Sequence, residues 1–168
     1  MLNKTKRPKP IQSISSTDLI LGLGTLSILF GSLFLAYNTY SELPDIIPTH
    51  FTINGTPDKF GNKSSLWLLP FISMVLCVGL WILSRFPQYF NYLTDITEEN
   101  AQRQYFLASK LVRVLAFVVS LIFLFATYET ILAAHNKNGI NGSWHFFFTI
   151  VSFLVVLIIY LFKSNKKG

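Results

Sequence analysis

The sequence contains a single cysteine, Cys77, among 168 residues, and few charged side chains. One thiol excludes a disulfide within the chain and any metal site built from several cysteines. Charged residues make up 13% of the chain, against roughly 25% in a typical soluble domain, whereas 51% of the residues are hydrophobic. This composition is typical of a membrane protein.

The sequence also lacks the short motifs of the commonest enzyme active sites. It contains no GxxxxGKS/T phosphate-binding loop, no HExxH zinc motif and no GxSxG nucleophile turn. The net charge is +6, but the basic residues lie at the ends of apolar runs and form no stripe interleaved with aromatic residues. We therefore expect neither an enzyme nor a nucleic-acid partner.

Four apolar runs divide the chain, at residues 19–40, 66–86, 111–134 and 144–162. Each is close to the roughly 20 residues that a helix needs to cross a bilayer. If the chain crosses four times, 11 of its 14 Lys and Arg residues fall on the side of the termini. Cationic flanking segments are retained in the cytoplasm. The sequence therefore predicts an all-α membrane protein with four transmembrane helices and both termini inside.

We interpret residues 1–168 as one membrane domain with a basic cytoplasmic tail, residues 1–18, an outer loop, residues 41–65, and an inner loop, residues 87–110. Residues 135–143, rich in Asn and Gly, are predicted to form a short outer turn. In the first run, Gly24, Ser27 and Gly31 recur at helical spacing and are predicted to pack against another helix, of this chain or of a second copy.

The outer loop carries the signals of a small β-hairpin. Residues 49–53 alternate with period two, and Asn54-Gly55 tolerates the positive φ angles of a tight turn. Phe51 and Ile53 are expected to face the helix ends, with His50 on the opposite face. From the pattern alone, a rigid cap on the bundle and a binding surface are equally good interpretations.

The two longer loops resemble a known family. The outer loop matches the pattern Leu-Pro-x-x-Ile-Pro-x-His-Phe followed by Gly, Asp and Lys, at Leu43, Pro44, Ile47, Pro48, His50, Phe51, Gly55, Asp58 and Lys63. The inner loop matches a second pattern that includes Glu99, Asn100, Arg103 and Tyr105. Together they resemble a bacterial membrane domain of unknown function that also forms the N-terminal module of SdpI-like toxin-immunity proteins.

The resemblance implies an integral protein of the bacterial plasma membrane. SdpI-like proteins confer resistance to a toxic peptide and can sequester a cytosolic repressor, but they have additional spans. By this resemblance the outer residues Pro44, Pro48, His50, Phe51, Gly55, Asp58 and Lys63 would bind an extracytoplasmic peptide or partner. The inner residues Glu99, Asn100, Arg103 and Tyr105 would contact a cytosolic regulator.

The inner stretch has its own chemical interpretation. Asp95 and Glu98 fit a capping box, which predicts that the third helix starts near Ile96 and continues into the membrane. Glu99 and Arg103 lie four residues apart and are expected to pair on one helix face. Such a pair is more often an exposed ion pair than a docking site.

An alternative function is a metal-assisted membrane enzyme or a transporter with a site at the outer mouth. His50, His135 and His145 all fall on the predicted outer side, and Glu129 lies near the outer end of the third run. Imidazole and carboxylate groups bind zinc and similar divalent ions. The metal candidates are therefore His50, Glu129 and His145. Without a fixed ligand spacing, a structural hydrogen-bonding role is the preferred interpretation, and we expect no other cofactor.

Overall fold

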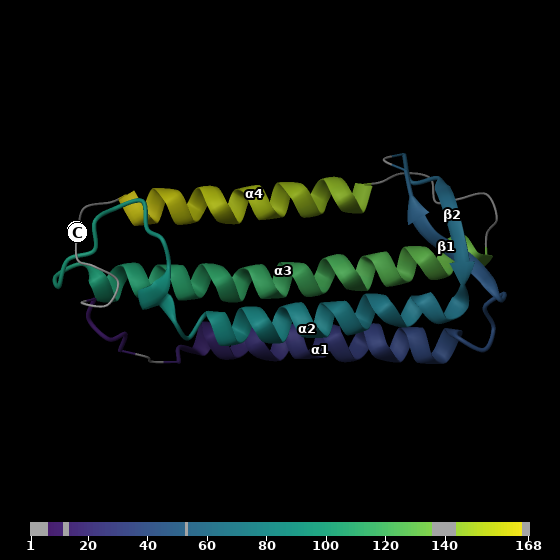
Figure 1. Ribbon diagram of the computed structural model, residues 1–168, viewed down its shortest axis with the longest axis horizontal. Helices are drawn as coiled ribbons and strands as arrows, with labels where there is room; N and C mark the ends of the chain where they lie inside the picture. Colours follow the sequence, from purple (N-terminus) through teal and green to yellow (C-terminus); the bar gives the residue numbers. More distant parts are fainter. Residues whose placement is uncertain (1–6, 12–13, 53, 136–143, 166–168) are drawn as a thin grey trace.

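The computed structural model describes residues 7–11, 14–52, 54–135 and 144–165, with the backbone alone for residues 144–146, 148, 149 and 165. Its elements are α1 (Ser16–Thr39), β1 (Ile46–Phe51), β2 (Pro57–Asn62), the 3₁₀ helix η2 (Lys63–Trp67), α2 (Leu68–Leu83), the 3₁₀ helix η3 (Pro87–Tyr89), α3 (Ala101–His135) and α4 (Trp144–Asn165). The four long helices lie side by side. The hairpin is at one end, and the start of α1 and the end of α4 are at the other (Figure 1).

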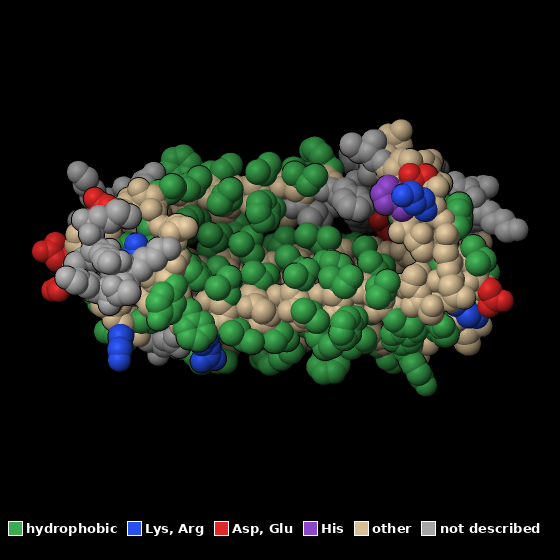
Figure 2. Space-filling view, in the orientation of Figure 1, with side chains coloured by type: hydrophobic (Ala, Val, Ile, Leu, Met, Phe, Trp, Pro, Cys, Tyr) green, Lys and Arg blue, Asp and Glu red, His purple; other side chains and the backbone are tan. Residues whose placement is uncertain are grey.

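The surface of the bundle is that of a protein in lipid. Among the described residues, three segments are long and apolar enough to cross a membrane, Ser16–Thr39, Lys63–Leu83 and Ala101–His135, and α4 contributes a shorter apolar stretch, Ile150–Ser164. Figure 2 shows hydrophobic side chains along the middle of the molecule and charged ones near its two ends. Phe30 is 69% exposed and Phe34 is 67% exposed. A water-facing surface rarely exposes apolar side chains over the whole length of a helix bundle. The protein is therefore a mainly helical, multi-span membrane protein.

Helix α3 is the centre of the bundle, because α1, α2 and α4 all pack against it. The hydroxyls of Ser32 and Thr127 lie 3.3 Å apart between α1 and α3. The Cys77 thiol on α2 donates to the Ala116 carbonyl of α3 at 3.3 Å. In lipid, where no hydrophobic force drives helices together, small residues and such hydrogen bonds hold the helices.

The packing face of α1 differs from the predicted one. Gly24 does face α3, since a Cβ there would lie 2.9 Å from the Phe117 ring. A Cβ at Gly31 would meet no described atom within 4 Å, and Ser27 is exposed. The buried residues of α1 are Asp18, Thr25, Leu29, Ser32 and Ala36. Within this chain, α1 therefore packs through a neighbouring stripe of residues and not through Ser27 and Gly31. Packing of Ser27 and Gly31 against a second copy stays a prediction.

The hairpin lies between the first two helices, as the sequence predicts. Strands β1 and β2 pair antiparallel, with Ile46 opposite Asn62 and Phe51 opposite Pro57. The turn is longer than two residues, because the Thr52 amide donates to the Thr56 carbonyl at 2.9 Å. Gly55 has φ of 78°, the left-handed conformation for which a glycine is needed. The predicted orientation of Ile53 lies outside the described residues.

One face of the hairpin is anchored to the helices. Ile47 is fully buried in a cluster with Ala36, Leu43, Leu66 and Ile131. These residues come from α1, the loop after it, η2 and the end of α3 next to the hairpin. The hairpin is thus attached to the bundle by apolar packing. The predicted turn after His135 lies outside the described residues.

Candidate functional sites at the two ends of the helical bundle

The outer face of the hairpin carries a polar pair that joins its strands. His50 Nδ1 and Asp58 Oδ1 lie 2.6 Å apart, with side chains 59% and 40% exposed. Figure 2 shows a histidine next to basic and acidic side chains at this end of the molecule. Two residues predicted to bind a partner are therefore brought together on an accessible surface.

Lys63, whose side chain is 23% exposed, contacts the chain that leads from α1 into the hairpin. Its ammonium donates to the Leu43 carbonyl and lies 3.3 Å from a carboxylate oxygen of Asp45. It also lies 5.4 Å from the centre of the Tyr40 ring. All three partners lie between the end of α1 and the start of β1, so Lys63 helps to position the hairpin. Of the other predicted binding residues, Pro48 is buried and Pro44 is exposed.

A cavity of about 290 Å³ lies beneath β1, between the hairpin and the outer ends of α2 and α3. Its lining is mainly apolar and consists of Pro48, Thr49, Phe51, Ser65, Leu66, Leu68, Leu69, Ile72, Ala126, Glu129 and Thr130. Phe51 therefore faces the helix ends, as the alternation predicts. Glu129 lines the same cavity. A residue of the predicted binding loop and a metal candidate therefore lie at one site.

The metal candidates are only partly placed. In the described part of the chain, no three His, Cys, Asp or Glu residues lie close enough together to hold a metal ion. The His145 side chain is outside that part. His50 contacts Asp58, and Glu129 lines the cavity. A divalent-metal site on His50, Glu129 and His145 stays a prediction.

The inner motif begins α3, but at a different residue from the predicted one. The Thr97 amide donates to the Asn100 side chain at 2.9 Å, and the Asn100 amide to the Thr97 hydroxyl at 3.3 Å. This reciprocal pair caps a turn that leads into α3 at Ala101. The predicted start near Ile96 was wrong, because Thr97 and Asn100 provide the cap that we assigned to Asp95 and Glu98.

Other residues of the inner motif connect the inner loop and α4 to α3. Tyr105 is 2% exposed and packs with Ile96 and Ala101. The Arg103 guanidinium donates to the Lys163 carbonyl of α4 at 2.9 Å. Glu99 is exposed. The motif has a clear structural use, and contact with a cytosolic regulator stays a prediction for these residues.

The N-terminal tail is part of this inner assembly. Arg7 is 8% exposed, and its guanidinium donates to the carbonyls of Gln88 at 3.1 Å and Phe90 at 2.8 Å. It also lies 5.5 Å from the centre of the Tyr92 ring. Burial raises the pKa of Tyr92, with further increases from neighbouring tyrosines and an opposing effect of Arg7. The Tyr92 hydroxyl therefore keeps its proton, which it donates to the Pro87 carbonyl at 2.8 Å.

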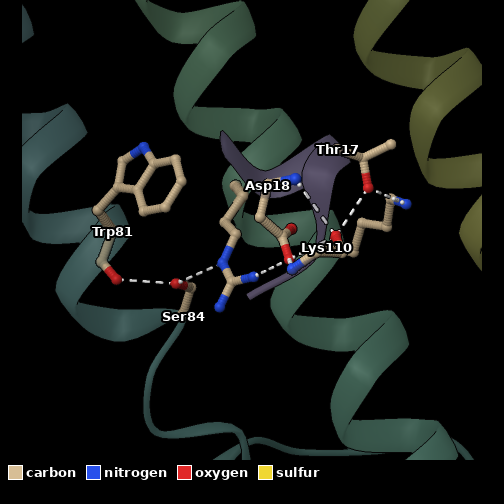
Figure 3. Close-up of polar contacts among 7 residues, drawn as sticks. Thr17, Asp18, Trp81, Ser84 and Lys110 are labelled. Atoms are coloured by element: carbon tan, nitrogen blue, oxygen red, sulfur yellow. Dashed lines mark hydrogen bonds and ion pairs between the residues drawn. The ribbon is translucent and has the colours of Figure 1, made fainter. Parts of the chain in front are cut away.

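Sequence reasoning missed a buried ion pair near the same end. Arg113 Nη1 lies 2.7 Å from Asp18 Oδ2, with side chains 10% and 1% exposed. Arg113 Nε donates to the Ser84 hydroxyl at 3.2 Å, and the guanidinium lies 5.6 Å from the Trp81 ring centre. Figure 3 shows this cluster, with Asp18 and Ser84 supplied by different segments. The guanidinium thereby joins α1, the end of α2 and α3.

The Asp18 carboxylate also caps α1. It accepts from the Ser15 amide at 3.0 Å and from the Ser15 hydroxyl at 2.7 Å. Lys110 Nζ donates to the Thr17 hydroxyl at 3.0 Å beside it. A usable signal was present in the sequence, because Asp18 and Arg113 have opposite charges and both lie at the predicted cytoplasmic edge of an apolar run.

A larger cavity, of about 770 Å³, lies between α1 and α2. Most of its lining is apolar, including Leu26, Val78 and Ile82, which are exposed along the lipid-facing length of the helices. We expect hydrocarbon tails of the bilayer to fill it. It contains none of the residues predicted to bind a partner.

Comparison with known proteins finds a match to a family model over the outer loop. Residues 27–74 match a domain of unknown function, DUF1648. The matched segment runs from α1 through the hairpin into α2. An uncharacterized protein of the archaeon Archaeoglobus fulgidus is 32% identical over 92 residues, which cover 50% of this chain and 49% of that protein. The chain thus spans about half the length of this relative. No solved structure matches.

The match confirms that residues 27–74 resemble a domain of unknown function, as the outer-loop pattern predicted. These similarities do not show that the protein is bacterial, since the relative is archaeal. Neither name states an activity.

Proposed function

We propose that the protein crosses a plasma membrane four times with both termini inside, and that its outer hairpin binds an extracytoplasmic peptide. The topology is supported by the start of α1 and the end of α4 at one end of the bundle (Figure 1). Most Lys and Arg residues belong to that end in the sequence pattern, as expected for a cytoplasmic side. Peptide binding would protect the envelope, as in the SdpI-like family that the loops resemble.

The observation that carries this proposal is the asymmetry of the hairpin. Its inner face is fixed by the fully buried Ile47. Its outer strand β2 exposes Asp58, Lys59 and Phe60. In the described part of the chain the sheet has two strands, which leaves the far edge of β2 without a strand partner. An extended peptide binds such an edge by adding a strand, and a rigid scaffold limits the entropy lost on binding.

A cap that only closes the bundle would need the anchored face alone. The exposed aromatic ring of Phe60 and the His50–Asp58 pair give the outer face both apolar and polar contacts. A peptide that is amphipathic matches this combination.

The proposal is tested by crosslinking in nanodiscs. A photoreactive amino acid replaces Lys59 in one variant and the exposed inner-loop residue Glu98 in another, and each is irradiated with a synthetic amphipathic peptide of leucine and lysine. We expect adducts at position 59 and none at position 98, because only the hairpin faces the peptide site. Expression in a susceptible bacterial host should also raise the inhibitory concentration of that peptide several-fold. Absence of both the adduct and the protection would contradict the proposal.

A further inference from the structure

We infer that the cavity beneath the hairpin binds a primary ammonium group carried on an apolar stem, such as a lysine side chain of the bound peptide, with Glu129 as its counter-ion. This inference rests on the proposed function, because the hairpin that would bind the peptide forms one wall of the cavity. Pro48, Thr49 and Phe51 of β1 provide that wall.

The cavity is large enough for one long side chain. Sites for drug-sized ligands occupy about 300–1,000 Å³, and this cavity of about 290 Å³ lies just below that range. It is too small for a folded peptide. A lysine side chain has a flexible apolar stem of four carbons and a compact charged head. The mainly apolar lining suits the stem.

The charge of the cavity selects the sign of the ligand. Among the described residues of the lining, Glu129 is the ionisable one, and the hydroxyls of Ser65 and Thr130 are the other polar side chains near it in the helical wall. The carboxylate belongs to a helix segment apolar enough to cross a membrane. Opposite charges attract more strongly where a site is partly shielded from water. A cation is therefore favoured beside Glu129, and an anion is disfavoured.

The cavity lies within reach of a peptide that is bound to the hairpin. Thr49 is exposed and Phe51 is half-buried, so β1 borders both the cavity and the outer surface. Carboxylates inside membrane segments are functional candidates by default. The apolar cavity, the Glu129 carboxylate and the adjoining hairpin together form a binding site for a cationic amphipathic peptide.

The test compares two peptides on the full chain in phosphatidylcholine nanodiscs, with binding to empty nanodiscs subtracted. One is the leucine and lysine peptide, and the other has every lysine acetylated, which removes the charge and retains the stem. Glu129→Gln should weaken binding of the charged peptide by about tenfold and leave binding of the acetylated peptide unchanged. The matched control is Glu42→Gln, which removes an exposed carboxylate outside the cavity and should change neither affinity.

A second variant keeps the test decisive if Glu129→Gln fails to fold. Ser65→Leu fills the cavity from η2 without altering the carboxylate, and should also weaken binding of the charged peptide. If wild type binds both peptides and neither variant changes either affinity, this inference fails while the proposed function stands. If wild type binds neither peptide, both fail. Loss of peptide binding when phosphatidylethanolamine is added would assign the cavity to a lipid ammonium and overturn the peptide assignment.

Discussion

Replacing Arg113 with glutamine should lower the free energy of unfolding by about 3–5 kcal/mol, because it leaves the Asp18 carboxylate buried without its cation. Asp18 is 1% exposed and lies 2.7 Å from the guanidinium. The same change removes the donor to Ser84, so α1 and α2 both lose a contact with α3. Unfolding of the purified protein in detergent, followed by circular dichroism against denaturant, measures the effect.

A double-mutant cycle separates the ion pair from the loss of packing. Asp18→Asn should destabilise the protein by a similar amount, and the combined Asp18→Asn, Arg113→Gln variant should be more stable than the sum of the single effects predicts. Asp45→Asn, which removes a carboxylate that is 87% exposed beside Lys63, is the control and should have little effect. Additive single effects in the cycle would show that the two charges do not support each other.

Replacing Ile47 with alanine should destabilise the attachment of the hairpin by about 2–5 kcal/mol, the usual range for removing most of a buried isoleucine side chain. Ile47 is fully buried and contacts the outer ends of α1 and α3 through its cluster. Release of the hairpin should appear as faster protease cleavage between β1 and β2 and as a lower melting temperature.

The neighbouring residue offers a close control. Ile46 is 59% exposed in the same strand, so Ile46→Ala removes the same atoms without opening a cavity. Its cleavage rate and melting temperature should match those of wild type. Equal sensitivity of the two variants would mean that burial of Ile47 does not hold the hairpin on the bundle.

Much of the fold follows from local patterns in the sequence. Long apolar runs predict the helices because lipid and helix geometry together fix their length. The position of the hairpin follows from period-two alternation and from Asn54-Gly55, whose glycine does adopt a positive φ. Each of these signals lies within a short segment, so no knowledge of distant contacts is needed.

The contacts that join distant segments could not be read in this way. Arg113 counts in the sequence as one of several cytoplasmic cations, yet it pairs with Asp18 on another helix. Arg7 is another such cation and is buried against the inner loop. Which partner a charge takes depends on how the helices are arranged around α3, and a single sequence contains no direct record of that arrangement.

The sequence predicted only part of the candidate site, because the site also depends on contacts between distant segments. The loop pattern includes residues that support the hairpin and residues that are free to contact a partner, and the sequence does not distinguish them. Pro48 is buried and Lys63 bonds to the segment before β1, whereas His50 and Asp58 are exposed. Glu129 was recognisable as a carboxylate in an apolar run, but its cavity is formed by β1, η2, α2 and α3 together. Only the folded chain shows that Phe51 and Glu129 share it.

The orientation of the bundle in the membrane is the central claim, and cysteine labelling tests it most directly. Cys77→Ser removes the one thiol and retains a donor to the Ala116 carbonyl. Lys59→Cys on the hairpin and Glu98→Cys in the inner loop then each provide a single exposed site. With a membrane-impermeant maleimide on intact cells, the account predicts labelling at position 59, and labelling at position 98 only after the cells are opened. Labelling at position 98 but not at position 59 in intact cells would contradict it.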